Sequence, residues 1–151
     1  MDDAIRAEAL AVTKREKFVY LTTLDASGFP ETRVLFNLLK TRAKALSSGP
    51  ARIETDFASY LGTNTSSAKI AQIRSDPRVC LYYSDTKGFY GCMVKGRMTE
   101  VFDPAIRKAV WTPSWNMYYS GGLDGGDFSL LSFEPESVRY YHGLKQHEFR
   151  A

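Results

Sequence analysis

Several familiar signatures of catalysis are missing from this sequence. Its 151 residues include only two cysteines and two histidines, and neither CxxC spacing nor metal-ligand spacing occurs. There is no Ser-His-Asp arrangement and no glycine-rich nucleotide motif, and His142 and His147 lack a paired nucleophile or carboxylate. These absences argue against a metal site, a hydrolase triad and a side chain that acts as catalytic acid or base.

Long apolar runs and a strong net charge are lacking as well. No apolar segment approaches membrane-spanning length, and the acidic, amphipathic start MDDAIRAEAL is unlike a signal or transit peptide. The formal net charge is only +3, and the basic segment 40–52 has no interleaved aromatic residues, so it does not indicate nucleic-acid binding. We expect a cytoplasmic protein that acts on a small molecule and binds neither nucleic acid nor membrane.

The residues that are present have the composition of one globular domain. Hydrophobic residues make up 44% of the chain and charged residues 25%, which suits a domain with a substantial core. Prolines and glycines are scattered, and no internal repeat is visible. We therefore predict a single domain over residues 1–151.

Strand patterns dominate the chain. Segments rich in aromatic and β-branched residues, separated by turn residues, predict strands at 17–24, 31–39, 53–63, 78–84, 89–102, 128–134 and 137–142. Helices are predicted at 1–15, 66–75 and 104–111. We expect a loop over 40–52, an irregular segment over 114–127 and no defined structure after residue 142. This is a mainly β fold, and closure into an antiparallel barrel would remove the exposed sheet edges.

The stretch GTNTSSAKIAQIRSDPRV, residues 62–79, is the most informative. Four hydroxyl side chains precede Lys69 at the expected start of a helix. Free backbone N–H groups and the helix dipole favour an anion there, whereas a lysine in the first turn opposes the dipole. A bound phosphate would resolve this conflict. The alternative is that Ser66 or Ser67 only caps the helix and Lys69 points into water.

Arg33 is a second candidate for anion binding. It lies between apolar residues of a predicted strand, which is unfavourable for a guanidinium unless it faces a polar cleft or a negative partner. An exposed strand face is the other explanation. Arg33 and Lys69 could meet on one phosphate only if the third predicted strand brings them together, and spacing does not establish this.

Nearly the whole chain resembles a known family, the FMN-binding split β-barrels of the pyridoxamine 5′-phosphate oxidase-like superfamily, and within it the general stress protein 26-like branch. The matching segments are GFPETRVLF, TNTSSAKIAQIRSDPRVCLYY, MVKGRMTEV and YYSGGLDGGDFSLLSFEPESVRYY. The resemblance implies a six- to seven-stranded antiparallel split β-barrel with short peripheral helices. It also implies a homodimer with flavin sites at the interface.

The resemblance implies FMN as the cofactor and identifies residues that would surround it. Those expected to bind FMN are Arg33, Val34, Leu35, Thr63, Ser67 and Lys69. The last three would hold the phosphate, and Arg33 would reach the polar or phosphate side of the flavin. Residues that would flank the flavin or the substrate opening are Trp111, Trp115 and Tyr118, although aromatic residues after a helix also serve as core or interface.

The chain departs from the oxidases themselves at several positions. Ala68 stands where they commonly carry an arginine, so one phosphate contact is missing. Leu38 replaces a lysine and Gly91 replaces a glutamine. No equivalent of their C-terminal substrate-binding segment follows Tyr141. These departures argue against vitamin B6 oxidase activity.

The resemblance favours an FMN-dependent oxidoreductase acting on a small molecule, in which the flavin itself carries out the reaction. A non-catalytic flavin-binding stress protein, acting as sensor or cofactor buffer, would need the same binding residues without a substrate pocket. The missing arginine at Ala68 leaves a deazaflavin or haem as further alternatives. Haem would require His142 or His147 as axial ligand.

Overall fold

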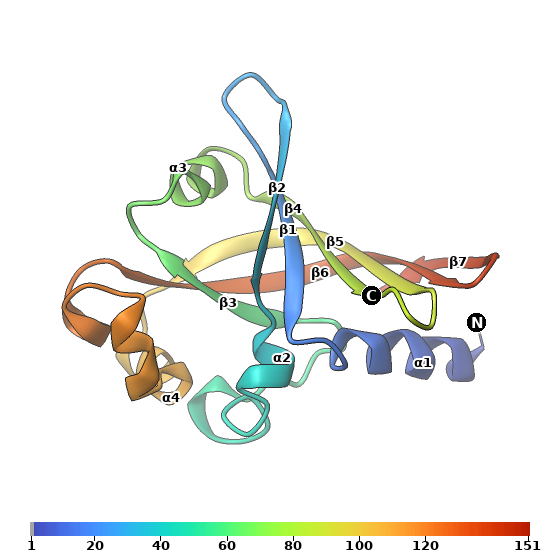
Figure 1. Cartoon of the computed structure of the whole chain (residues 1–151), viewed down its shortest axis with the longest axis horizontal. Helices are drawn as coiled ribbons and strands as arrows, with labels where there is room; N and C mark the ends of the chain where they lie inside the picture. Colours follow the sequence, from blue (N-terminus) through green and yellow to red (C-terminus); the bar gives the residue numbers. More distant parts are fainter. Residues whose placement is uncertain (1) are drawn as a thin grey trace.

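Seven antiparallel strands form one sheet in the computed structural model, which describes residues 2–151 (Figure 1). They are β1 Phe18–Leu24, β2 Pro30–Phe36, β3 Ser59–Asn64, β4 Arg78–Asp85, β5 Tyr90–Val101, β6 Phe128–His142 and β7 Lys145–Arg150. Their order is β2-β1-β4-β5-β6-β3, and β7 pairs with β6. The predicted mainly β fold is confirmed.

Four short helices within residues 2–151 lie around this sheet. They are α1 Asp3–Thr13, α2 Leu38–Thr41, α3 Ala68–Ser75 and α4 Pro104–Val110. As predicted, α4 begins with Pro104 at its first position and with Asp103 as its cap, whose carboxylate accepts the Ala105 N–H. None of the helices in residues 2–151 has the length and apolar composition needed to cross a membrane.

The two end strands of the sheet, β2 and β3, lie side by side but share no hydrogen-bonded ladder. The barrel is therefore split along this line. Because edge strands carry unpaired backbone N–H and C=O groups, both sides of the split can bind a ligand. Helix α3 follows β3 directly and packs on β1, so its start lies next to the split, and the β1–β2 hairpin projects beside it (Figure 1).

The interior of the barrel is filled by alternate strand residues. In β1, Val19 and Leu21 are buried, whereas Phe18 and Tyr20 are exposed on the outer face, which is the period-two pattern of a half-buried strand. Fully buried residues from the other strands include Leu61, Leu81, Val94, Met98, Leu130 and Tyr140. This core holds the strands in register and positions the split.

Two predicted strands, 128–134 and 137–142, are one continuous strand, so their separation was wrong. Pro135 lies within β6 and pairs with Gly96, where the β5 register shifts between Lys95 and Gly96. A proline cannot donate to the ladder and is tolerated at such a bulge. A Cβ on Gly96 would lie 2.1 Å from the Glu134 carbonyl oxygen, so the close approach of the two strands requires glycine.

Other boundaries also differ from the predictions. The second strand ends at Phe36, not at residue 39, because the Asn37 side chain accepts the Leu39 N–H and starts α2. The loop over 40–52 contains the end of α2 and a 3-10 turn, Gly49–Ala51. The tail is not unstructured, because residues 145–150 pair with 137–142 as β7.

Candidate functional site

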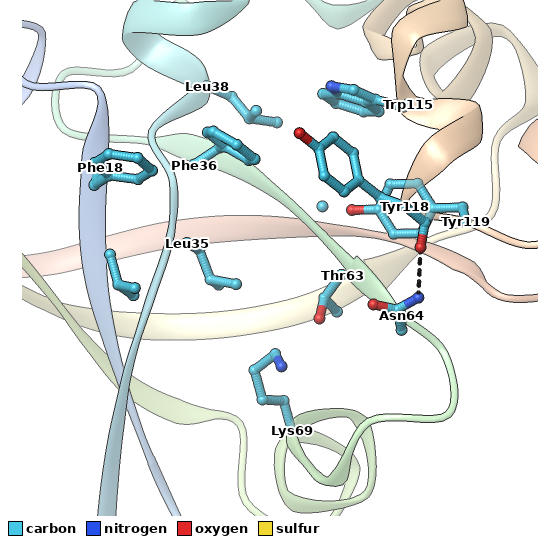
Figure 2. A pocket seen from close by; sticks show the side chains of 12 residues that line it. Phe18, Leu35, Phe36, Leu38, Thr63, Asn64, Lys69, Trp115, Tyr118 and Tyr119 are labelled. Atoms are coloured by element: carbon cyan, nitrogen blue, oxygen red, sulfur yellow. Dashed lines mark hydrogen bonds between the residues drawn. The ribbon is translucent and has the colours of Figure 1, made fainter.

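A pocket of about 230 Å³ lies at the split between β2 and β3 (Figure 2). Its walls come from the ends of these strands, the first turn of α3 and the segment after α4. The lining residues are Phe18, Val34, Leu35, Phe36, Leu38, Gly62, Thr63, Asn64, Lys69, Trp115, Tyr118 and Tyr119. The fold thus brings the ETRVLF and GTNTSSAK segments together, a proximity that sequence spacing did not establish.

Most of the residues predicted from the sequence lie at this pocket. Those that line it are Val34, Leu35, Thr63, Lys69, Trp115 and Tyr118. Arg33 and Ser67 lie beside Lys69, outside the lining itself. Trp111 does not line the pocket. Its ring packs instead against other aromatic rings, 5.7 Å from that of Trp115 and 5.1 Å from that of Phe128. The lining residues that were not predicted as site residues are Phe18, Phe36, Leu38, Gly62 and Asn64.

Ser67 has an unusual environment. Its backbone occupies the cap position of α3, but its side chain makes no capping hydrogen bond. Within residues 2–151 its Oγ atom is buried without any hydrogen-bond partner. Leaving such a group unpaired costs about 1–3 kcal/mol. A hydroxyl that only capped the helix would accept one of the first free N–H groups, so the geometry favours the anion interpretation.

Lys69 lies in the first turn of α3 and is half-buried in the pocket wall, so it does not point freely into water. Burial lowers the pKa of its ammonium group, and the nearby charge of Arg33 lowers it further. Within residues 2–151 Lys69 makes no ion pair, whereas Arg33 pairs with the Glu31 carboxylate at 3.4 Å. Two cations and the positive end of a helix dipole therefore meet in one place, which an anion would stabilise.

Arg33 lies among polar groups of the β1–β2 hairpin and α3 rather than in the apolar core. Its Nη1 atom donates to Thr23 Oγ1 at 2.6 Å and to the Glu31 carbonyl at 2.9 Å. Its Nη2 atom donates to Gln72 Oε1 at 3.2 Å. Burial lowers the pKa of the guanidinium and Glu31 raises it. These partners of Arg33 were not predicted from the sequence, although Gln72 follows Lys69 by three residues and shares its helix face.

Asp127 anchors the loop that joins β3 to α3. Its carboxylate accepts the Asn64 side-chain amide at 2.8 Å and the Ser66 N–H at 3.0 Å, and these hydrogen bonds lower its pKa. The Asn64 amide also donates to the Tyr118 carbonyl at 3.1 Å (Figure 2). Asp127 ends the segment 114–127 that was predicted to be irregular, and through Asn64 it connects the β3–α3 loop to the aromatic segment.

One side of the pocket is aromatic. Trp115 and Tyr119 are buried, and burial raises the pKa of the Tyr119 hydroxyl to about 12, so it stays protonated at neutral pH. Tyr118 is half-exposed, with its ring 5.9 Å from Phe36, which in turn stacks on Phe18 at 5.4 Å. Flat apolar walls of this kind suit a planar ring.

The pocket therefore has the polarity that FMN requires. Its aromatic walls suit the ring, and Lys69, with Arg33 and the Ser67 hydroxyl beside it, suits the phosphate. The two histidines lie elsewhere: His142 stacks on Tyr90 at 4.3 Å and His147 on Tyr140 at 6.4 Å. Neither lines the pocket, so haem would find no axial histidine there. In the part of the chain described, no group of three His, Cys, Asp or Glu residues could hold a metal ion.

Replacing Ser67 with alanine is expected to leave the ligand-free protein at least as stable as wild type, with a gain of up to about 1–3 kcal/mol in the free energy of unfolding, because it removes a buried hydroxyl that has no hydrogen-bond partner in residues 2–151. Asp103→Ala is the matched control: it removes a working cap and should cost about 1 kcal/mol. Chemical denaturation measures both. A loss of about 1 kcal/mol in Ser67→Ala would identify Ser67 as an ordinary cap.

Several solved structures share this fold. A protein related to general stress protein 26, from Clostridium acetobutylicum, is 26% identical with a TM-score of 0.78, over 99% of this chain and 96% of that one. The general stress FMN/FAD binding protein of Xanthomonas citri is 17% identical with a TM-score of 0.71, over 95% and 92%. A pyridoxamine 5′-phosphate oxidase-related, FMN binding protein of Nostoc punctiforme is 16% identical with a TM-score of 0.64, over 94% and 86%.

A sequence comparison with curated proteins found no match. The family described as pyridoxamine 5′-phosphate oxidase like, in contrast, matches residues 38–148. This range contains the β3–α3 loop, Lys69 and the aromatic segment of the pocket. The chain belongs to the pyridoxamine 5′-phosphate oxidase like family.

Proposed function

We propose that this protein binds FMN in the pocket between β2 and β3, with the phosphate at the start of α3, and uses it to oxidise or reduce a small molecule. The observation that carries the proposal is the buried, unpartnered Ser67 hydroxyl beside Lys69 and Arg33. The FMN-binding relatives from Nostoc punctiforme and Xanthomonas citri support it.

Each part of the phosphate site has a separate role. The Ser67 hydroxyl donates a hydrogen bond to a phosphate oxygen, and the Lys69 ammonium contributes a charge-assisted bond. The first N–H groups of α3 and its dipole add to this attraction. Arg33 contributes positive charge from the neighbouring strand. Ala68 offers no side-chain contact, so the site has one cation fewer than the oxidases described above.

The remaining residues hold and shield the ring. Because β2 pairs with β1, only one of the two neighbours Val34 and Leu35 has backbone groups that face away from β1, and these can bond to the polar rim of the ring. Thr63 of β3 lines the same pocket and would help Ser67 and Lys69 to hold the phosphate. When bound, FMN supplies hydride or electron transfer. The pocket lining contains no carboxylate and no imidazole, so the protein contributes binding, orientation and exclusion of water. Turnover of reduced nicotinamide with an electron acceptor would separate an oxidoreductase from a non-catalytic flavin-binding protein.

The phosphate should account for a large part of the affinity. We expect wild type to bind FMN at least about tenfold more tightly than riboflavin, and Lys69→Ala to remove most of this difference, because a charge-assisted hydrogen bond is lost. Arg74→Ala is the control, since it removes a cation from the same helix that is paired with Glu100. Fluorescence titration with both flavins measures the affinities, and equal FMN binding by wild type and Lys69→Ala would contradict the site.

FMN affinity should also fall as the pH rises through the pKa of Lys69. Burial and Arg33 lower this pKa below 10.5 in the flavin-free protein, and a bound phosphate would raise it. Affinity is therefore full below the lowered pKa and is lost above it, because only the ammonium form binds the phosphate. Lys69→Arg keeps its charge and should show a flat profile. A wild-type profile as flat as that of Lys69→Arg up to pH 10.5 would contradict this expectation.

We also propose that two copies associate through the outer face of β1 and β2. Phe18, Tyr20 and Val34 lie on this face and are between 44% and 51% exposed, which is typical of an interaction surface. Phe18 and Val34 also line the pocket, so a second copy there would help to enclose the flavin.

Sedimentation analysis tests this association. Wild type should be a dimer at micromolar concentration, and Tyr20→Glu should weaken the dimer at least about tenfold by placing a charge in an apolar interface. Leu144→Glu, at the fully exposed tip between β6 and β7, is the control. A monomeric wild type would overturn the proposed association.

A further inference from the structure

Gln72 links helix α3 to the β1–β2 hairpin. It lies one turn after Lys69, on the same face of α3. Its Oε1 atom accepts hydrogen bonds from Thr23 Oγ1 and from Arg33 Nη2, the latter at 3.2 Å. Its Nε2 atom donates to the Glu31 carboxylate at 3.0 Å. One amide group on the helix therefore meets three polar side chains of the hairpin.

This network fixes the guanidinium of Arg33. Its two terminal nitrogens donate to Thr23, to Gln72 and to the Glu31 backbone, and Nη2 lies 3.4 Å from the Glu31 carboxylate. Thr23 is buried, so its hydroxyl is a fixed acceptor. With these partners the planar group has little freedom to rotate, and its charge stays close enough to Lys69 to lower the pKa of that lysine.

We propose that Gln72 is a positioning residue for the flavin phosphate. It holds the Arg33 guanidinium against α3, so that the charge of the strand and the start of the helix act on the same anion. Gln72 does not itself contact the phosphate. This inference rests on the proposed FMN site.

A glutamine amide suits this position because it has both a hydrogen-bond acceptor and a hydrogen-bond donor. Its oxygen accepts from Arg33, and its nitrogen donates to Glu31. A glutamate would still accept from Arg33 but would repel Glu31 and add a second negative charge near the phosphate. Methionine has a similar length but provides neither bond.

The first experiment compares FMN and riboflavin binding in Gln72→Met, with Gln146→Met on the exposed face of β7 as the matched control. We expect FMN to bind about tenfold more weakly to Gln72→Met, because hydrogen bonds to a charged group are lost. Riboflavin affinity should change by less than about twofold, because it has no phosphate. An equal loss for both flavins would show a structural role only and would overturn the inference.

The second experiment tests whether the effect passes through Arg33. In an Arg33→Met background, Gln72→Met should weaken FMN binding by less than about twofold, because there is no guanidinium left to position. The exchange variant Glu31→Gln/Gln72→Glu again surrounds Arg33 with one carboxylate and one amide, and should bind FMN within about threefold of wild type. Full additivity of the two methionine substitutions would overturn the inference.

A third measurement separates this inference from the proposed function. Chemical denaturation without flavin should show non-additive losses for Arg33→Met and Gln72→Met, since the two side chains bond directly. If the two losses in unfolding free energy are additive, the positioning role is overturned, whatever the result of the flavin titrations. Wild-type protein that binds FMN no better than riboflavin overturns instead the proposed phosphate site, while non-additive unfolding would still show that Gln72 holds Arg33.

Discussion

The site depends on the concentration of positive charge at the start of α3. Lys69 and Arg33 are both half-buried, and the charge of Arg33 adds to burial in lowering the pKa of Lys69. The helix dipole adds positive potential at the same point, and the Ser67 hydroxyl is buried without a hydrogen-bond partner in residues 2–151. The fold holds the two positive charges close together although they repel each other. A bound anion would reduce this repulsion.

Two features of the fold maintain this arrangement. The missing ladder between β2 and β3 leaves a split into which a ligand can enter, and the α3 helix begins at the end of one of its walls. The Asp127 carboxylate holds the β3–α3 loop through hydrogen bonds to Asn64 and Ser66. Gln72 of α3 holds the Arg33 side chain through a further hydrogen bond. The proposed phosphate site and the aromatic wall are thereby connected, since Asn64 bonds both to Asp127 and to the backbone of the aromatic segment.

Much of this could be predicted from the sequence, and the failures have a common cause. Local patterns located most strands, the starts of α3 and α4, and the candidates Arg33, Ser67 and Lys69. The continuity of β6 through Pro135 and the existence of β7 depend on pairing with distant residues. The roles of Gln72 and Asp127 depend in the same way on which segments meet at the split, and no local pattern records such contacts.

A crystal structure of the protein grown with FMN would test the central claim most directly. The account predicts the ring between β2, β3 and the Trp115–Tyr119 wall, with a phosphate oxygen within hydrogen-bonding distance of both Ser67 Oγ and Lys69 Nζ. A flavin bound elsewhere, or one whose phosphate extends into solvent away from α3, would contradict it.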